Sequence, residues 1–173
     1  MIADYLTNVK GYNPAVVAGL VASIYDSSGG DANTIGDNGY SYGIIQWNKE
    51  RWDDFNTYCE TNNYDGSDLG TQLYYLTEVY MDDHCLDPSM IAYDYENASD
   101  CFSQEEDTEA KAKEVAKYAT INFMRPENIG AAKDRRAYMA SEIYKLMQNN
   151  PDMTYGEAVQ IVNDKIKANA RAY

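Results

Sequence analysis

Residues 24–47 read IYDSSGGDANTIGDNGYSYGIIQW, and the elements on either side can be worked out from this stretch. Upstream of it, Asn13 supplies a helix N-cap and Pro14 a first-turn proline, and apolar residues follow at helical spacing. The glycine pair at Gly29 then ends the helix, because glycine adopts the left-handed conformation of a helix C-terminus at little cost. The sequence therefore predicts a buried helix over residues 14 to about 27.

Two further segments complete the region around this helix. Residues 31–43 are polar and rich in glycine, asparagine and aspartate, which is typical of a loop or a small hairpin. Residues 44–58 carry Trp47, Trp52 and later aromatic residues at a spacing close to that of one helical face. We therefore expect a polar hairpin followed directly by a helix.

The rest of the chain is predicted to be helical. Asp68 can cap one helix, residues 109–123 and 134–148 show helical periodicity, and Thr154-x-x-Glu157 is a capping box before a last helix. No internal repeat or interdomain linker is present, and 173 residues suit one compact domain. The predicted fold class is α+β and mostly α-helical, with a small β-hairpin or loop lobe beside the first helix.

Charge and hydropathy exclude several classes of partner. Acidic residues outnumber basic ones by 28 to 14, so the net charge is -14, which should repel nucleic acids and anionic membranes. No run approaches the roughly 20 apolar residues of a membrane helix, and the start of the chain lacks the pattern of a signal peptide. We therefore expect a protein made in the cytoplasm, with no nucleic-acid or membrane partner.

Cysteine and histidine give little support to a metal site. Cys59, Cys85 and Cys101 allow at most one intramolecular disulfide, and the pairing is open. The sole histidine, His84, stands beside Cys85 among acidic residues, and no CxxC motif occurs, so a polar helix end is favoured over a zinc site. The sequence predicts neither a metal nor a cofactor.

Several motifs resemble those of phage tail lysozyme domains, a lysozyme-like family related to lytic transglycosylases. In that family a helix ends in a Glu-Ser-Gly motif and is followed by an IGDNG-type loop and a YGxxQW string, and here the corresponding segments are 27–29, 35–39 and 42–47. The FMRP string at 123–126, followed by Arg135 or Arg136, is similar to a later landmark. The resemblance spans residues 2 to 147. It implies a lysozyme-like domain over 1–147, with residues 148–173 forming a C-terminal helix packed on that domain or extending it.

The resemblance also implies a ligand and a site. The expected ligand is the glycan strand of peptidoglycan, bound in a groove that has the hairpin as one wall. The candidate substrate-binding residues are Ser41, Tyr42, Gly43, Gln46, Met124 and Arg125. The amide of the glutamine could bond either an N-acetyl group of the sugar or neighbouring backbone.

Two positions depart from the family pattern in a way that affects chemistry. The catalytic glutamate of the family corresponds to Ser27, and a second carboxylate that family members often carry corresponds to Met124. A serine hydroxyl is too weak an acid to protonate a glycosidic oxygen at neutral pH. Asp26, Asp31 and Asp37 are the nearby carboxylates that could substitute, although a solvated helix position for Asp26 and turn chemistry for Asp37 explain them more simply.

Two functions follow, of different classes. The favoured one is a catalytically degenerate lysozyme-like domain that binds glycan, or a protein partner through the helix after Thr154. The alternative is an active muramidase or lytic transglycosylase that cleaves the β-1,4 bond between N-acetylmuramic acid and N-acetylglucosamine with a substitute carboxylate. Deliberate inactivation at Ser27 is a third explanation, disfavoured because Met124 would then be an unnecessary second change. Either protein would act at the cell wall as part of a phage or secretion machine.

Overall fold

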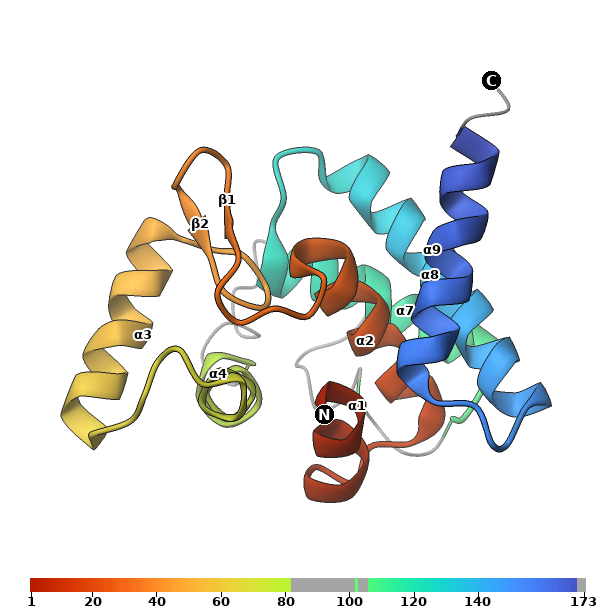
Figure 1. Ribbon diagram of the computed structural model, residues 1–173, viewed down its shortest axis with the longest axis horizontal. Helices are drawn as coiled ribbons and strands as arrows, with labels where there is room; N and C mark the ends of the chain where they lie inside the picture. The colour runs from red at the N-terminus through yellow and green to blue at the C-terminus, as the bar shows by residue number, and fades with distance from the viewer. Residues whose placement is uncertain (82–101, 103–105, 171–173) are drawn as a thin grey trace.

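The computed structural model describes residues 1–81, 102 and 106–170 (Figure 1). Its α-helices are α1 (Ile2–Asp4), α2 (Pro14–Ser28), α3 (Lys49–Asn62), α4 (Leu69–Tyr75), α7 (Glu109–Ala119), α8 (Ile129–Asn149) and α9 (Tyr155–Ala170). The π-helical turns η1 (Tyr5–Val9), η2 (Leu76–Tyr80) and η4 (Thr120–Met124) continue α1, α4 and α7. Strands β1 (Ile35–Gly36), β2 (Ser41–Tyr42) and β3 (Trp47–Asn48) form an antiparallel sheet in that order. The predicted class, α+β and mostly helical, is confirmed.

Helix α2 forms the centre of the molecule, as Figure 1 shows. The side chain of Asn13 accepts a hydrogen bond from the Val16 amide at 2.9 Å, and Gly29 ends the helix with a φ of 67°. Every residue from Ala15 to Ile24 is buried, and α7 and α8 both pack along the helix. The predicted boundaries of this helix are therefore confirmed.

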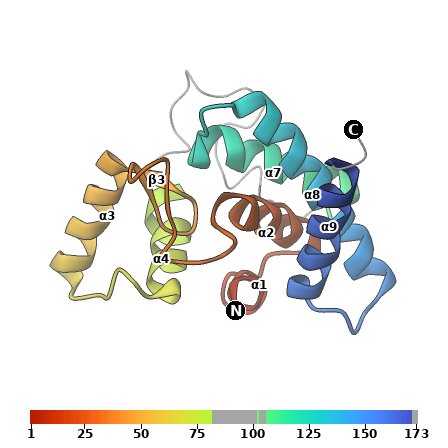
Figure 2. The same cartoon turned by 45° about the horizontal axis from the view of Figure 1, so that its top comes forward.

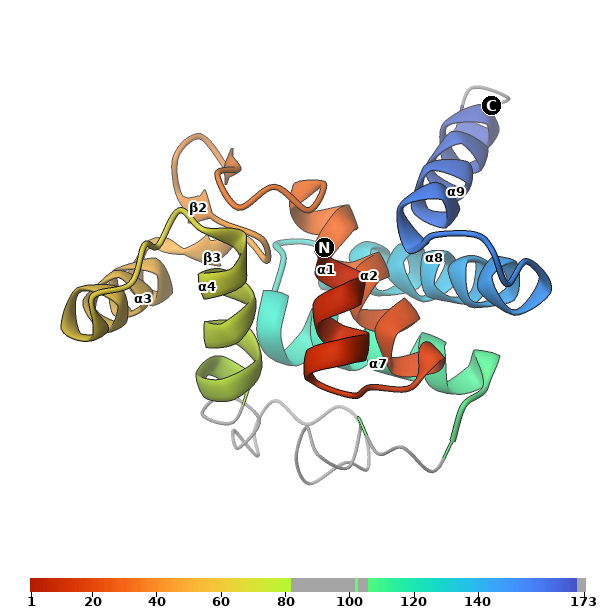
Figure 3. The ribbon, with the colours of Figure 1, turned by 60° about the horizontal axis from the view of Figure 1, so that its bottom comes forward.

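The C-terminal helix α9 packs against α8 and α2, and Figure 3 shows it crossing α8. Three of its apolar side chains, Ala158, Val159 and Val162, are buried and belong to the same hydrophobic core as α2. Helix α9 therefore shares its buried face with the helices that position α2.

Shortening Val162 tests how much α9 contributes to the stability of the fold. Val162→Ala is expected to lower the free energy of unfolding by about 2 kcal/mol, because it removes two methyl groups from a fully buried site and leaves a cavity. Urea denaturation monitored by circular dichroism measures the loss. The matched control is Ile161→Ala, since Ile161 is 36% exposed and should cost much less. Equal losses at the two positions would mean that α9 adds little to the core.

On the other side of α2 lie the sheet, α3 and α4, and a buried glutamine ties their connections together. Gln72 of α4 is fully buried; its Oε1 accepts from the Ile44 amide at 3.0 Å, and its Nε2 donates to the carbonyls of Ala32 and Gly66 at 2.9 Å each. Removal of this side chain would leave these three backbone groups, two of them buried, without these partners. The amide thus fixes the loop before β1 and the turn before β3 relative to α4.

The helix expected over residues 44–58 begins later than predicted. Trp47 and Asn48 instead form β3, with Trp47 opposite Tyr42 of β2, and α3 starts at Lys49. The Asn48 side chain caps α3 by accepting from the Arg51 amide at 3.1 Å. The strand pairing and this cap together override the helical spacing of the aromatic residues.

The remaining sequence expectations concern cysteine, metal and membrane. Cys59 is free and buried, whereas Cys85, Cys101 and His84 lie outside the described residues. Over residues 1–81, 102 and 106–170, no group of three or more histidine, cysteine, aspartate or glutamate side chains is arranged to hold a metal ion. None of the helices in these same ranges combines the length and apolar character needed to cross a bilayer.

Candidate functional site

A pocket of about 520 Å³ lies at the C-terminal end of α2. Its walls come from the hairpin, the start of α3, and the segment that links η4 to α8, all of which surround this end of α2 in Figure 2. The volume is within the range of about 300 to 1,000 Å³ that is usual for ligand sites. Three carboxylates and three guanidinium groups line it: Asp26, Asp37, Glu127, Arg51, Arg125 and Arg136. The pocket is therefore balanced in charge, although the whole chain carries a net charge of -14.

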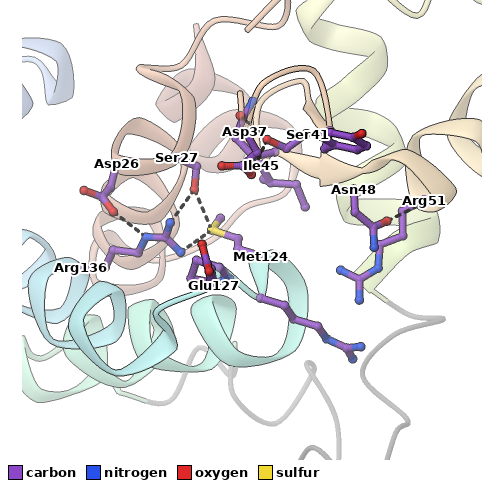
Figure 4. Close-up of a pocket in the computed structure, with 14 residues that line it drawn as sticks. Asp26, Ser27, Asp37, Ser41, Ile45, Asn48, Arg51, Met124, Glu127 and Arg136 are labelled. Atoms are coloured by element: carbon purple, nitrogen blue, oxygen red, sulfur yellow. Dashed lines mark hydrogen bonds and ion pairs between the residues drawn. The ribbon is translucent and has the colours of Figure 1, made fainter. Parts of the chain in front are cut away.

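Ser27, which the resemblance described above aligns with a catalytic glutamate, lines this pocket. Its hydroxyl donates to the Ser23 carbonyl one helical turn back at 2.9 Å, and it accepts from Nη2 of Arg136, also at 2.9 Å (Figure 4). The Met124 sulfur lies 3.3 Å from the same oxygen. No imidazole, amine or carboxylate contacts Ser27 among the described residues, so nothing there can activate it as a nucleophile.

The neighbouring Asp26 is held by two arginines of α8. Its carboxylate accepts from Nε and Nη2 of Arg135 at 2.6 and 2.7 Å and from Nε of Arg136 at 2.8 Å. Its side chain is only 10% exposed, so the expectation of a solvated helix position is wrong. The prediction from sequence missed these partners because they lie more than 100 residues away in the chain.

These contacts also decide the protonation of Asp26. Burial alone would raise the pKa of its carboxyl, but the hydrogen bonds and charges of Arg135 and Arg136 outweigh burial and lower that pKa overall. A general acid at neutral pH needs the opposite shift. As Figure 4 shows, the Asp26 side chain also points toward Arg136, on the far side of Ser27 from the hairpin.

Met124 and Arg125 form the wall opposite the hairpin. Met124 is buried, and its sulfur lies 3.3 Å from Nη1 of Arg136, so it packs against the guanidinium where a glutamate could have paired with it. Arg125 adopts a left-handed backbone conformation with a φ of 45°, and its Nε donates to the Asn122 carbonyl at 3.1 Å. Both residues line the pocket, as expected for groove residues.

Ser41 and Gln46 also line the pocket, and their side chains hold the hairpin in shape. Nε2 of Gln46 donates to the carbonyls of Gly43 and Thr34 at 2.9 and 3.2 Å, and its Oε1 lies 2.9 Å from the Ser41 hydroxyl. A Cβ on Gly36 would lie 2.1 Å from the same Oε1, which explains why a glycine is needed there. The glutamine amide thus bonds neighbouring backbone, and a bond to an N-acetyl group of the sugar stays a prediction.

Tyr42 and Gly43 do not line this pocket. They border a second depression, shared with Trp52, and the rings of Tyr42 and Trp52 stack with centroids 5.6 Å apart. Gly43 has a φ of 75°, and a Cβ there would lie 2.7 Å from Oε1 of Gln72. Because strand residues alternate between faces, Ser41 and its neighbour Tyr42 project to opposite sides of the sheet.

Seven residues that line the pocket were not among the predicted site residues: Tyr40, Ile45, Asn48, Arg51, Pro126, Glu127 and Arg136. Tyr40 is 69% exposed, which leaves its ring open to a ligand. Nη1 of Arg51 donates to the Phe123 carbonyl at 3.3 Å and so joins α3 to the opposite wall. The position of Tyr40 within the family-like loop and of Arg51 after the YGxxQW string could have signalled them, whereas nothing local marks Glu127.

The carboxylates that could substitute for the missing glutamate differ in whether they line the pocket. Asp31 does not line the pocket, and its Oδ1 instead accepts from the Asn33 amide at 2.8 Å in a local turn. Asp37 lines the pocket and lies 2.8 Å from the Ser41 hydroxyl, and Glu127 lines it from the other side. Both of these side chains are exposed, whereas a carboxyl that serves as a general acid at neutral pH is usually buried.

Comparison with known proteins assigns the chain to a family. Residues 1–147 match the family model described as phage tail lysozyme, a range that includes α2, the sheet and every residue that lines the pocket. No curated protein and no solved structure gives a significant match to the chain. Since the matched range covers most of the 173 residues, from α1 to the last turns of α8, this chain belongs to the phage tail lysozyme family.

Proposed function

We propose that this protein binds the glycan strands of peptidoglycan in the pocket at the end of α2 and does not cleave them at neutral pH. Membership of the phage tail lysozyme family supports the ligand and a place of action at the bacterial cell wall, within a phage or secretion machine. The size of the pocket and its mixture of exposed aromatic, amide and charged groups suit a sugar chain.

The proposal that the protein does not cleave glycan rests on the environment of Ser27. Its hydroxyl donates to a carbonyl of α2 and accepts from Arg136, and no carboxyl group of the described residues is hydrogen-bonded to it. Asp26, the adjacent carboxylate, is committed to two arginines that keep it ionised. Protonation of the leaving oxygen, the step that a glycosidase requires, thus has no buried acid at this position.

Cleavage with a substitute carboxylate is the alternative, and it would fall to Asp37 or Glu127, the other two carboxylates in the pocket. Release of soluble fragments from purified peptidoglycan by the unmodified protein would overturn the proposal. Asp37→Asn and Glu127→Gln, measured separately, would then identify the group responsible.

Binding itself is tested at Tyr40. Tyr40→Ala is expected to weaken pull-down by insoluble peptidoglycan about fivefold, because it removes an exposed ring from the wall of the pocket. The matched control is Tyr64→Ala, since Tyr64 is 48% exposed but does not line the pocket. Equal binding by both variants and the parent, at unchanged melting temperature, would argue against a glycan site in this pocket.

A further inference from the structure

We propose that the corner of the pocket formed by Ser27, Met124 and Arg136 binds a carboxylate of the ligand. The inference rests on the proposed function, since it specifies which glycans the same pocket prefers. In this arrangement the ligand supplies the negative charge that the chain lacks at position 27.

The local count of charges favours an anion at this corner. Arg135 and Arg136 both bind Asp26, so two guanidinium groups share one carboxylate. Arg135 is 46% exposed and can be solvated, but the Arg136 side chain is only 5% exposed. The positive charge of a buried cation that shares its counter-ion is only partly neutralised. A second carboxylate within reach would neutralise more of that charge.

The hydrogen bonds of Arg136 point to the same place. Its Nε is bound to Asp26, but the hydrogen-bond partners of the two terminal nitrogens among the described residues are all neutral: the Ser27 hydroxyl at 2.9 Å, the Met124 sulfur at 3.3 Å and the Thr120 hydroxyl at 3.4 Å. Thioether sulfur is a weak acceptor, and the Thr120 contact is long. The terminal nitrogens can therefore exchange weak partners for a carboxylate, which matches the fork of a guanidinium.

The corner also borders the pocket in which the ligand would lie. Ser27, Met124 and Arg136 all line the pocket, and Figure 4 shows the Arg136 guanidinium directed at Ser27 and Met124. Arg51 and Arg125 line the wall beyond them, and together with Arg136 they offset the three carboxylates of the pocket, so the pocket does not share the net negative charge of the whole chain.

The chemistry of peptidoglycan offers this carboxylate on the sugar itself. The lactyl group of N-acetylmuramic acid carries a free carboxylate wherever the stem peptide has been removed, whereas chitin has no such group. Small free carboxylates could occupy the same corner by the same chemistry. A competition experiment distinguishes a carboxylate carried by the sugar from a free one.

The test is calorimetric titration near pH 7 with two tetrasaccharides. One alternates N-acetylglucosamine with N-acetylmuramic acid bearing free lactyl carboxylates, and the other is the neutral chitin tetramer. The parent protein is expected to bind the carboxylated sugar about tenfold more tightly, the effect of one charge-assisted hydrogen-bonded contact. Excess acetate, against chloride at the same ionic strength, shows whether a free carboxylate competes for the corner.

Variants locate the effect. Ser27→Asp places a carboxylate of the protein beside Arg136 and is expected to abolish the preference for the carboxylated sugar over the neutral one. Arg136→Gln should abolish it as well, and Ser27→Asp keeps the test decisive if the loss of a buried arginine unfolds the protein. Lys165→Gln removes one positive charge from α9, away from the pocket, and should leave the preference intact.

The outcomes separate this inference from the proposed function. Equal affinity of the parent for both sugars would overturn the carboxylate site and leave glycan binding standing, and failure of both sugars to bind would overturn both proposals. A preference that survives Ser27→Asp would place recognition elsewhere and overturn the site. Competition by acetate would support a general carboxylate site, and a preference unaffected by acetate would support recognition of the lactyl sugar.

Discussion

Replacement of Ser27 by glutamate is expected to make the protein release soluble fragments from purified peptidoglycan, at a rate on the order of 100-fold above that of the parent. The reason is that Ser27 is at the end of α2, on the floor of the pocket, where a longer side chain can project toward a bound glycan. General acid catalysis commonly contributes factors of this size or more. The measurement is the reducing or anhydro ends released, compared with the parent under the same conditions.

The restored activity should depend on pH in a defined direction. Nη2 of Arg136 lies 2.9 Å from the oxygen that the glutamate would replace, and a neighbouring positive charge lowers the pKa of a carboxyl. A general acid works only when protonated, so activity should fall as pH rises through that lowered pKa. The Ser27→Glu protein is thus expected to be more active at about pH 5 than at about pH 7.

Two further variants distinguish the effect of the acidic proton from the effect of the larger side chain. Ser27→Gln has nearly the same size without an acidic proton and should remain inactive. Adding Met124→Glu to Ser27→Glu tests the second carboxylate that the family pattern places in this wall. If neither glutamate variant releases soluble fragments and the protein does not bind glycan, a structural or partner-binding role is left for this fold.

The limits of prediction from sequence follow from the range of the interactions involved. Helix α2 was predicted with correct ends because Asn13, Pro14 and Gly29 act on the residues next to them. The start of α8 could have been predicted better in the same way. Residues 134–148 were predicted as helical, but the helix begins five residues earlier, at Ile129, where Asn128 caps it by accepting from the Ala131 amide at 3.1 Å. Local capping signals were present in both cases.

The residues of the site could be predicted from the sequence only in part. The resemblance to a family predicted that Ser27, Ser41, Gln46, Met124 and Arg125 belong to one groove, and all five line the pocket. It placed Tyr42 there as well, although the pairing of Tyr42 with Trp47 in the sheet turns that side chain to the other face. Contacts between residues far apart in the chain cannot be read from spacing, and the link of α2 to α8 is of this kind.

That link is expected to be one of the strongest single contributions to stability outside the apolar core. Asp26→Asn should lower the free energy of unfolding at pH 7 by about 3 kcal/mol, because the amide keeps the shape of the carboxylate but leaves the buried guanidinium of Arg136 without its counter-ion. This loss is at the lower end of the range for buried ion pairs, because Arg135 is 46% exposed and water screens its interaction with Asp26.

The pH dependence of this loss distinguishes an ion pair from a packing defect. The pKa of Asp26 is lowered in the folded protein, so its contribution is complete above the unfolded pKa of about 3.9 and is lost as pH falls through the lower folded pKa. The stability difference between the parent and Asp26→Asn should accordingly stay constant from pH 7 down to about 5 and shrink below about pH 4. Urea denaturation across this range measures it, with Asp53→Asn as the control, because Asp53 pairs with Lys49 on the exposed surface and should cost little at any pH. A difference that persisted undiminished in acid would show that the asparagine disturbs packing, and that the charge of Asp26 does not hold α2 to α8.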